Sequence, residues 1–294
     1  MKRASVFLTA LTLVCAIPSW AQTATLQRLP DTGETVAQLL ARHLPRSIQR
    51  AGAGKRVIGL DGTDQNFIID GAGSIPGNGG TYFRSDVTIA NYRGSTQYFA
   101  VGWLKQGIDS GSDPVQYFSI PPNQVVSYRD FVAQTIHQSG LGSIIVFGQT
   151  SSHGSDSGAL LDGNSRIWTN QPGSSGSVSL GFAPLSLSDL ANSGASNKAY
   201  VTGLRQDSGY RTNTGIVNLD NVSHTWTVRV NDGSTSFTVT VPAFSMQQVA
   251  ISSGNFGDLF LSLQADSGSF FWSAYGVSVD NTTGDGWVSH AVQP

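Results

Sequence analysis

The sequence predicts an all-β protein built from two tandem, similar antiparallel β-sandwiches that follow a short N-terminal helix. Three observations lead to this prediction. Charged residues make up only 12% of the chain, and Glu34 is its single glutamate, so good helix formers are scarce. From residue 57 onward, short alternating runs of apolar and polar residues are separated by turn residues. The same motifs then occur twice in the same order.

Residues 1–21 have the layout of a secretory signal peptide. Two basic residues precede an apolar stretch at 6–17, and small residues lead to a cut between Ala21 and Gln22. The apolar stretch is too short for a membrane core, which needs about 20 residues. Cys15, the single cysteine, lies inside this stretch and leaves with it. We therefore expect a secreted or periplasmic protein with no disulfide and no membrane span in the mature chain.

Residues 22–56 form a basic arm and linker, whereas the rest of the chain is net acidic. A helix is expected within 31–50, because Asp31 and Glu34 resemble a capping box and apolar residues recur at helical spacing. Pro45 should end or kink this helix. The sequence is consistent with an arm that docks on the acidic part and equally with a mobile leader.

The remaining chain divides into two repeats, 57–190 and 191–294. Strands are expected at 67–69, 87–89, 98–104, 124–128 and 143–147, and 131–137 fits either a helical turn or a loop. The motifs that match in order are Phe83-Arg84-Ser85-Asp86 with Tyr210-Arg211-Thr212-Asn213, Phe99/Val101/Trp103 with Trp226/Val228/Val230, Ile120-Pro121 with Val241-Pro242, residues 142–146 with 257–261, and residues 165–170 with 276–281. Five matches in one order indicate a duplicated unit.

This pattern resembles a duplicated module of exported bacterial proteins that mostly lack an assigned function. The similar features are a Gly-rich start at 71–80, the aromatic-Arg-Ser/Thr-Asp/Asn strand and the late turn at 280–285, and together they cover about residues 65–290. The resemblance implies β-sandwiches of Ig-like or jelly-roll character. It carries over no catalytic residues.

Ser157 is the most tempting nucleophile, because Ser155-Asp156-Ser157-Gly158 resembles the serine-protease run and His153 is near. A catalytic triad also needs a positioned base and carboxylate, and no motif around His43 supplies them. Asp-Ser-Gly recurs at Asp207 and Asp266, which is typical of turns. Likewise, Gly52-Ala53-Gly54-Lys55 lacks the rest of a phosphate loop and is interpreted as a linker.

Metal and nucleic-acid sites find little support. The five histidines have no zinc-ligand spacing. Calcium remains a weaker hypothesis at residues 61–66 and 280–285, where oxygen-bearing side chains cluster, although such clusters usually form turns. Otherwise no cofactor is expected. No basic groove with interleaved aromatics occurs, so nucleic acid is not expected as a partner.

Exposed aromatic residues are the candidate sugar-binding groups. Strand alternation predicts that Trp103 and Trp226 point into their cores. Tyr98 falls on the opposite face of its strand, whereas Tyr92 and Trp287 fall in expected turns, and these three are the carbohydrate-binding candidates. The two equivalent arginines, Arg84 and Arg211, suit either a paired anion site or, as we prefer, bonds to nearby turn oxygens.

The sequence therefore favours an exported, non-catalytic protein for surface binding, adhesion or structural assembly. The alternative is a carbohydrate-binding module, and a secreted hydrolase ranks third. An extracellular polysaccharide or protein surface is the expected partner, and no oligomeric state is predicted.

Overall fold

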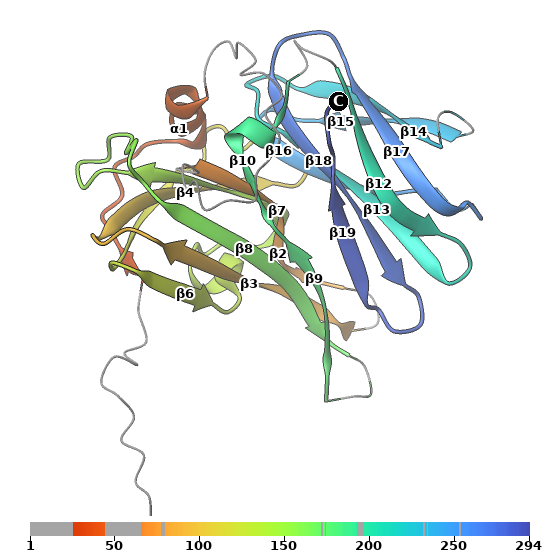
Figure 1. The fold of residues 1–294 in the computed structure, drawn as a ribbon, viewed down its shortest axis with the longest axis horizontal. Coiled ribbons are helices and arrows are strands. Elements are labelled where there is room, and N and C mark those ends of the chain that lie inside the picture. The colour runs from red at the N-terminus through yellow and green to blue at the C-terminus, as the bar shows by residue number, and fades with distance from the viewer. Residues whose placement is uncertain are drawn as a thin grey trace, which may run out of the picture.

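The computed structural model describes residues 26–44, 66–77, 80–171, 173, 175–192, 197–231, 233, 235–252 and 254–294. These residues form antiparallel sheets with little helix, which confirms the all-β class. The strands fall into a first strand group, β1–β10, and a second strand group, β11–β19, which lie side by side (Figure 1). Within the described part of the chain, no helix is long and apolar enough to cross a membrane.

The first strand group is one ten-stranded sheet whose two halves are linked through β2 and β3. These two strands pair with each other only at residues 74–76 and 82–84. The halves then stack as layers, since a Cβ on Gly163 of β8 would lie 2.9 Å from the Phe67 ring of β2. The strands are β1 (Gln27–Arg28), β2 (Asn66–Pro76), β3 (Tyr82–Asn91), β4 (Gln97–Lys105), β5 (Gln116–Ile120), β6 (Gln124–Tyr128), β7 (Gly140–Gln149), β8 (Leu161–Asn170), β9 (Ser177–Phe182) and β10 (Pro184–Ser186).

The second strand group consists of two sheets, β11-β18-β13-β16 with β19 on β18, and β12-β17-β14-β15. The sheets face each other across an apolar layer in which the Trp226 and Trp272 rings lie 5.7 Å apart. The strands are β11 (Ala191–Asn192), β12 (Lys198–Gln206), β13 (Tyr210–Asn218), β14 (His224–Val230), β15 (Thr235–Val241), β16 (Ser245–Ala250), β17 (Gly257–Ala265), β18 (Phe271–Asp280) and β19 (Gly286–His290).

The ladders of the first strand group recur in the second. In the first group β3 pairs with β6 and β8, β8 with β9, β4 with β5 and β7, and β2 with β7. In the second group β13 pairs with β16 and β18, β18 with β19, β14 with β15 and β17, and β12 with β17. Even the bulges correspond, because β2 shifts register between Ile69 and Ala72 and β12 between Val201 and Leu204.

One motif match is displaced by two residues. Val101 pairs with Val146, whereas its counterpart Val228 pairs with Leu263 rather than Leu261. The prediction that aligned 142–146 with 257–261 is therefore wrong in register. An even shift keeps the same side chains on the same face of a strand, so apolar alternation alone does not detect it.

The two strand groups share one core. Val217 of β13 and Tyr275, Val277 and Val279 of β18 are buried in the same apolar cluster as the core of the first group. Neighbouring residues of these strands, Ile216, Trp272 and Ala274, point instead into the core of the second group. The sheet that contains β13 and β18 is thus covered on both faces.

A buried carboxylate lies at the junction of the groups. Asp70, in the bulge of β2, is fully buried. The Ser273 hydroxyl donates to Asp70 Oδ1 over 2.6 Å, and Nδ1 of His290 lies 3.2 Å from Oδ2. These contacts join the first group to β18 and β19 and satisfy a group that would be costly to bury alone.

The N-terminal helix is shorter than the sequence suggested. Helix α1 spans Val36–His43, and its capping box consists of Thr35 and Gln38 rather than Asp31 and Glu34. The helix ends before Pro45, as expected from the missing proline N–H. Its residues Val36, Leu39 and Leu40 are buried, so this part of the arm packs on the first strand group.

A second helix follows β6. Helix α2 (Phe131–Gln134) is one turn long and lies within the stretch 131–137 that fitted a helical turn. Phe131 and Val132 are buried against the first group's core.

Candidate functional site

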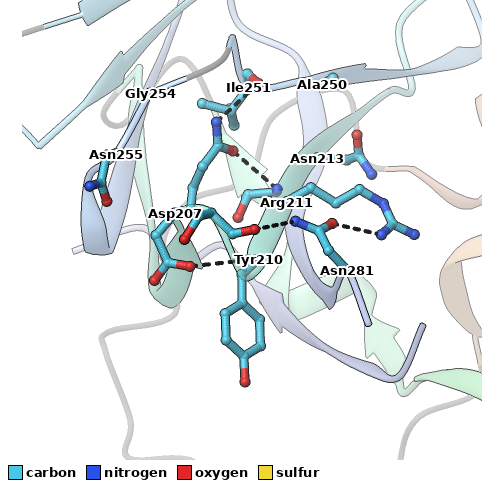
Figure 2. Close-up of a pocket in the computed structure, with 12 residues that line it drawn as sticks. Asp207, Tyr210, Arg211, Asn213, Ala250, Ile251, Gly254, Asn255 and Asn281 are labelled. Carbon is cyan, nitrogen blue, oxygen red and sulfur yellow. Dashed lines mark hydrogen bonds between the residues drawn. The ribbon is translucent and has the colours of Figure 1, made fainter. Parts of the chain in front are cut away.

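A hollow of about 410 Å³ lies at one end of the second strand group, and we call it the Arg211 hollow. Three segments line it: the hairpin between β12 and β13, the connection from β16 to β17, and the turn that follows β18 (Figure 2). Arg211, Asn213, Asn255 and Asn281 present guanidinium and amide groups there. These groups are the hydrogen-bond donors and acceptors of the site.

Gln206 fixes the wall of the hollow. Its side chain is buried, accepts from the Thr212 N–H over 3.1 Å and donates to the Ile251 and Ser252 carbonyls over 3.3 and 2.8 Å. Its backbone carbonyl accepts from the Phe256 N–H. One buried amide thus ties the hairpin to the connection between β16 and β17, so the lining segments are held together.

Arg211 is oriented by an amide rather than by an acid. Its Nη1 donates to Asn281 Oδ1 over 3.0 Å, and Asn281 in turn donates to the Ser208 carbonyl over 3.3 Å. Among the described residues, no carboxylate lies within ion-pair distance of Arg211. The guanidinium is exposed, so its charge is carried at the surface of the hollow.

The other charged residue of the lining, Asp207, is already paired. Arg205 Nε donates to Asp207 Oδ2 over 2.7 Å, and the N–H groups of Gly209 and Tyr210 donate to Oδ1. These bonds, the one from Arg205 foremost, hold the pKa of Asp207 below its usual value. The Arg205 guanidinium also lies 4.5 Å from the centre of the Tyr210 ring.

An aromatic pair lies at the edge of the hollow: Tyr210 belongs to the lining, although its ring points away from Arg211 and Asn213 (Figure 2), and Trp287 is outside the lining. The rings of Tyr210 and Trp287 meet at 62° with centroids 5.7 Å apart. Trp287 donates its indole N–H to the Gly203 carbonyl over 2.7 Å and keeps 38% of its surface exposed. Trp287 lies in strand β19, not in a turn as predicted. Tyr and Trp at such an edge offer apolar rings with a polar group beside them.

No family model matches the chain, and no curated protein matches it.

The equivalent place in the first strand group is filled. There the connection from β6 to β7 carries α2, whereas the described residues between β16 and β17 include no helix. Arg84, the counterpart of Arg211, has its Nε 3.8 Å from the Asp130 carboxylate and its guanidinium 4.8 Å from the Tyr82 ring centre. The preferred interpretation, a bond to a nearby turn oxygen, fits Arg211, which donates to Asn281, whereas Arg84 makes an ion pair with Asp130.

The three aromatic candidates lie in different places. Tyr92, 53% exposed, follows β3, and its hydroxyl lies 3.5 Å from Asp162 Oδ2. Tyr98 is half-buried in β4. Both belong to the first strand group, whereas Trp287 belongs to the second, beside the hollow. The predicted inward faces of Trp103 and Trp226 are confirmed, since both are buried.

Ser157 is part of a turn. The Asp156 carboxylate accepts from the Gly158 N–H over 3.0 Å and forms an ion pair with Arg93. Burial raises the pKa of Asp156, but the bonds from Gly158, Gln97 and Arg93 outweigh it and leave that pKa below its usual value. This arrangement fits the interpretation of Asp-Ser-Gly as a turn motif.

The structure brings Ser155, not Ser157, to a histidine. Ser155 Oγ lies 3.4 Å from His43 Nε2, and the Gln149 amide nitrogen lies 3.1 Å from the same atom. Burial, with a smaller effect of Arg42, lowers the pKa of His43 to about 4. A histidine with that pKa is a weak base at neutral pH, so it activates a hydroxyl poorly.

Of the two candidate calcium sites, only the one at 280–285 lies fully within the described residues. Among the described residues, no three metal-ligating side chains gather. Asp280 Oδ1 accepts from the N–H groups of Thr282 and Thr283 over 2.6 and 3.0 Å, so it closes its own turn. Residues 61–65, the loop at 52–55 and the cleavage site Ala21–Gln22 lie outside the described residues.

Sequence reasoning missed Tyr210, Asn213 and Asn255 as site residues. Tyr210 and Asn213 belong to a repeated strand motif that indicates structure rather than binding, and no motif includes Asn255. The available signal was length: the second repeat has fewer residues between the strands that correspond to β6 and β7.

Proposed function

We propose that this chain is an exported, non-catalytic protein that binds carbohydrate in the Arg211 hollow. The observation that carries the proposal is a hollow lined by one guanidinium and three asparagine amides beside the Tyr210–Trp287 pair. A sugar presents many hydroxyls, which such donors and acceptors bind, and an apolar ring face, which an aromatic side chain covers. A hollow with a small number of polar groups in its lining is typical of small-ligand sites.

Two hydrogen-bonding groups are ready for a ligand. The side-chain amides of Asn213 and Asn255 make no hydrogen bond with another described residue. Each amide offers a carbonyl acceptor and two N–H donors. Because Gln206 holds the lining segments together, these amides need little rearrangement on binding, which favours affinity.

The non-catalytic part of the proposal has its own support. The nearest serine–histidine contact, Ser155 to His43, has a long distance of 3.4 Å and a histidine of low pKa. Ser157, the serine singled out by sequence, lies in an Asp-Ser-Gly turn. Hydrolysis of any member of a glycan, ester or peptide panel would contradict this part, and its loss in Ser155→Ala or Ser157→Ala would identify that serine as the nucleophile.

We further infer that residues 1–21 are a signal peptide, and that two copies of one β-sandwich unit, 57–190 and 191–294, follow the arm at 22–56. The equivalent ladders of β2–β9 and β12–β19 support the duplication. Intact mass spectrometry of the exported protein tests the processing. A chain that begins at Gln22 is expected, and a retained N-terminus or a lipid on Cys15 would contradict it.

Binding to a glycan panel, measured by calorimetry, tests the proposed function. Tyr210→Ala and Asn213→Ala should each weaken the tightest interaction about tenfold or more, because each removes a group of the site. Tyr92→Ala is the matched control, an exposed aromatic outside the hollow. Binding that Tyr92→Ala abolishes and Tyr210→Ala spares would place the site elsewhere, and no binding to any glycan would contradict the proposal.

A second candidate, structural assembly, rests on one exposed strand edge. β15 pairs with β14 and with no other described strand. Its counterpart β5 is covered by β1, since Gln27 pairs with Ser119. An uncovered edge is a template for adding a strand from another molecule.

Light scattering over a range of protein concentrations tests assembly. If β15 mediates it, the mass should rise with concentration, and Thr238→Lys should prevent the rise by placing a charge on the edge. A monomer at every concentration would exclude this candidate.

A further inference from the structure

We propose that the sugar bound in the Arg211 hollow is acidic, and that its carboxylate pairs with Arg211. This inference rests on the proposed function and specifies its ligand as a uronic acid within a polysaccharide. Two arginines that occupy equivalent places in the two strand groups differ in their partners.

Arg84 finds a carboxylate within the chain, and Arg211 does not. Asp130, which precedes α2, lies 3.8 Å from Arg84. The described residues between β16 and β17 contain no such helix. The strand registers make Ile251 the counterpart of Asp130, because Tyr128 pairs with Val87 and Val249 with the equivalent Thr214. The position that a carboxylate takes in one group is thus taken beside Arg211 by the apolar, buried Ile251, so no internal charge matches the guanidinium there. A ligand can supply the missing charge there.

The charge balance of the hollow favours one negative group. Asp207 and Arg211 are the charged residues among those that line it, and Asp207 is paired with Arg205. One guanidinium therefore remains to be matched. A single carboxylate matches it, whereas a phosphate dianion would leave one negative charge without a partner.

The geometry of Arg211 suits a carboxylate. Asn281 Oδ1 accepts from Nη1 and so holds one end of the guanidinium. A guanidinium has five N–H donors, so others remain for a ligand and can bind both carboxylate oxygens at once. The neutral amide of Asn213 lies on the same side of the hollow as the guanidinium and is then available for a hydroxyl of the same sugar, whereas Asn255, on the opposite side, is available for another unit of the polysaccharide (Figure 2).

Calorimetry with matched acidic and neutral sugars tests the inference. The probes are trisaccharides of galacturonic, glucuronic and mannuronic acid, and the methyl ester of each, which removes the charge and keeps the hydroxyls. We expect at least one acid to bind about tenfold or more tightly than its ester, and Arg211→Gln to remove that preference. Arg211→Lys should restore part of it, because lysine keeps the charge without the fork.

Arg84→Gln is the matched control, because it removes the equivalent arginine outside the hollow and should leave the preference for the acid intact. Equal binding of acid and ester would overturn the inference and leave the proposed function standing. Preference for the acid that persists in Arg211→Gln would also overturn it. If neither acid nor ester nor any neutral glycan binds, the proposed function fails and the inference fails with it.

Discussion

Asn91 and Asn218 make the same set of hydrogen bonds in the two strand groups. The amide nitrogen of Asn91 donates to the carbonyls of Ser95, Ile120 and Pro121. That of Asn218 donates to the carbonyls of Val222, Val241 and Pro242. Each side-chain oxygen also accepts from the N–H two residues later. Both residues close the same corner between strands.

This equivalence gives the first prediction. Asn91→Ala and Asn218→Ala should each lower the free energy of unfolding by about 2–3 kcal/mol, because buried carbonyls lose their donor. Urea denaturation followed by fluorescence measures both. A large effect at one asparagine and none at the other would show that the two corners are not equivalent.

A second equivalent pair, Gln97 and His224, predicts a rescue. Gln97 accepts from Arg93 over 3.0 Å and donates to Asp156 over 3.2 Å. His224 lies 2.8 Å from Asp220 and 2.7 Å from Asp266. Arg93 of the first group thus corresponds to Asp220 of the second. The central residue differs accordingly: Gln97 bonds to an arginine and an aspartate, whereas His224 lies between two aspartates.

His224→Gln alone should lower the free energy of unfolding by about 1–3 kcal/mol, because an amide oxygen would face the Asp220 carboxylate. Adding Asp220→Arg recreates the arrangement of Arg93, Gln97 and Asp156, and should recover at least half of the loss. A double-mutant cycle measures this coupling. Losses that simply add would contradict the equivalence.

Two tryptophans test the assignment of core and surface. Trp226 is fully buried, so Trp226→Ala should lower the free energy of unfolding by about 3–5 kcal/mol. Trp287 keeps 38% of its surface exposed, and Trp287→Ala should cost about 1 kcal/mol. Chemical denaturation of both variants decides, and a near-neutral Trp226→Ala would place that ring outside the core.

His43 gives a prediction for pH. Its pKa in the folded protein is about 4, below the ordinary 6.5, so the unfolded chain binds the proton more readily. The contribution of neutral His43 to the free energy of unfolding is therefore complete above about pH 6.5 and is lost as the pH drops toward about 4. The free energy of unfolding, measured by denaturation across this window, should fall more steeply with decreasing pH in the native protein than in His43→Gln. Identical curves would show that His43 is not buried as described.

The all-β class and the faces of the central tryptophans could be predicted from composition and alternation. The shared core could not be predicted in the same way, because it depends on how the two strand groups meet. A signal was nevertheless present. Strand β18 is buried along nearly its whole length, and its run Phe-Trp-Ser-Ala-Tyr-Gly-Val lacks the polar alternation of a strand with one face in water.

The capping of α1 shows why local signals mislead. Asp31 and Glu34 have the spacing of a capping box, but Thr35 and Gln38 have it too, and the chain uses the later pair. The Glu34 carboxylate instead contacts Arg42 and the Tyr117 hydroxyl. Tertiary contacts of Glu34 therefore determine which of the two possible capping boxes forms.

The Arg211 hollow was beyond prediction because segments far apart in sequence form it. Its lining comes from residues 206–208, 210–213, 250–251, 254–255 and 281, and none of these stretches carries a binding motif. The repeat indicated that Arg84 and Arg211 are equivalent. It did not show that α2 would occupy one site and leave the other open.

Chemical-shift mapping of the asparagine side-chain amides tests the central claim most directly. The protein, labelled with ¹⁵N at asparagine, is titrated with the oligosaccharide that binds most tightly in the panel. Binding in the Arg211 hollow predicts that the side-chain signals of Asn213, Asn255 and Asn281 shift together, with one dissociation constant, while that of Asn91 stays in place. Shifts confined to asparagines of the first strand group, or none at saturating sugar, would contradict it.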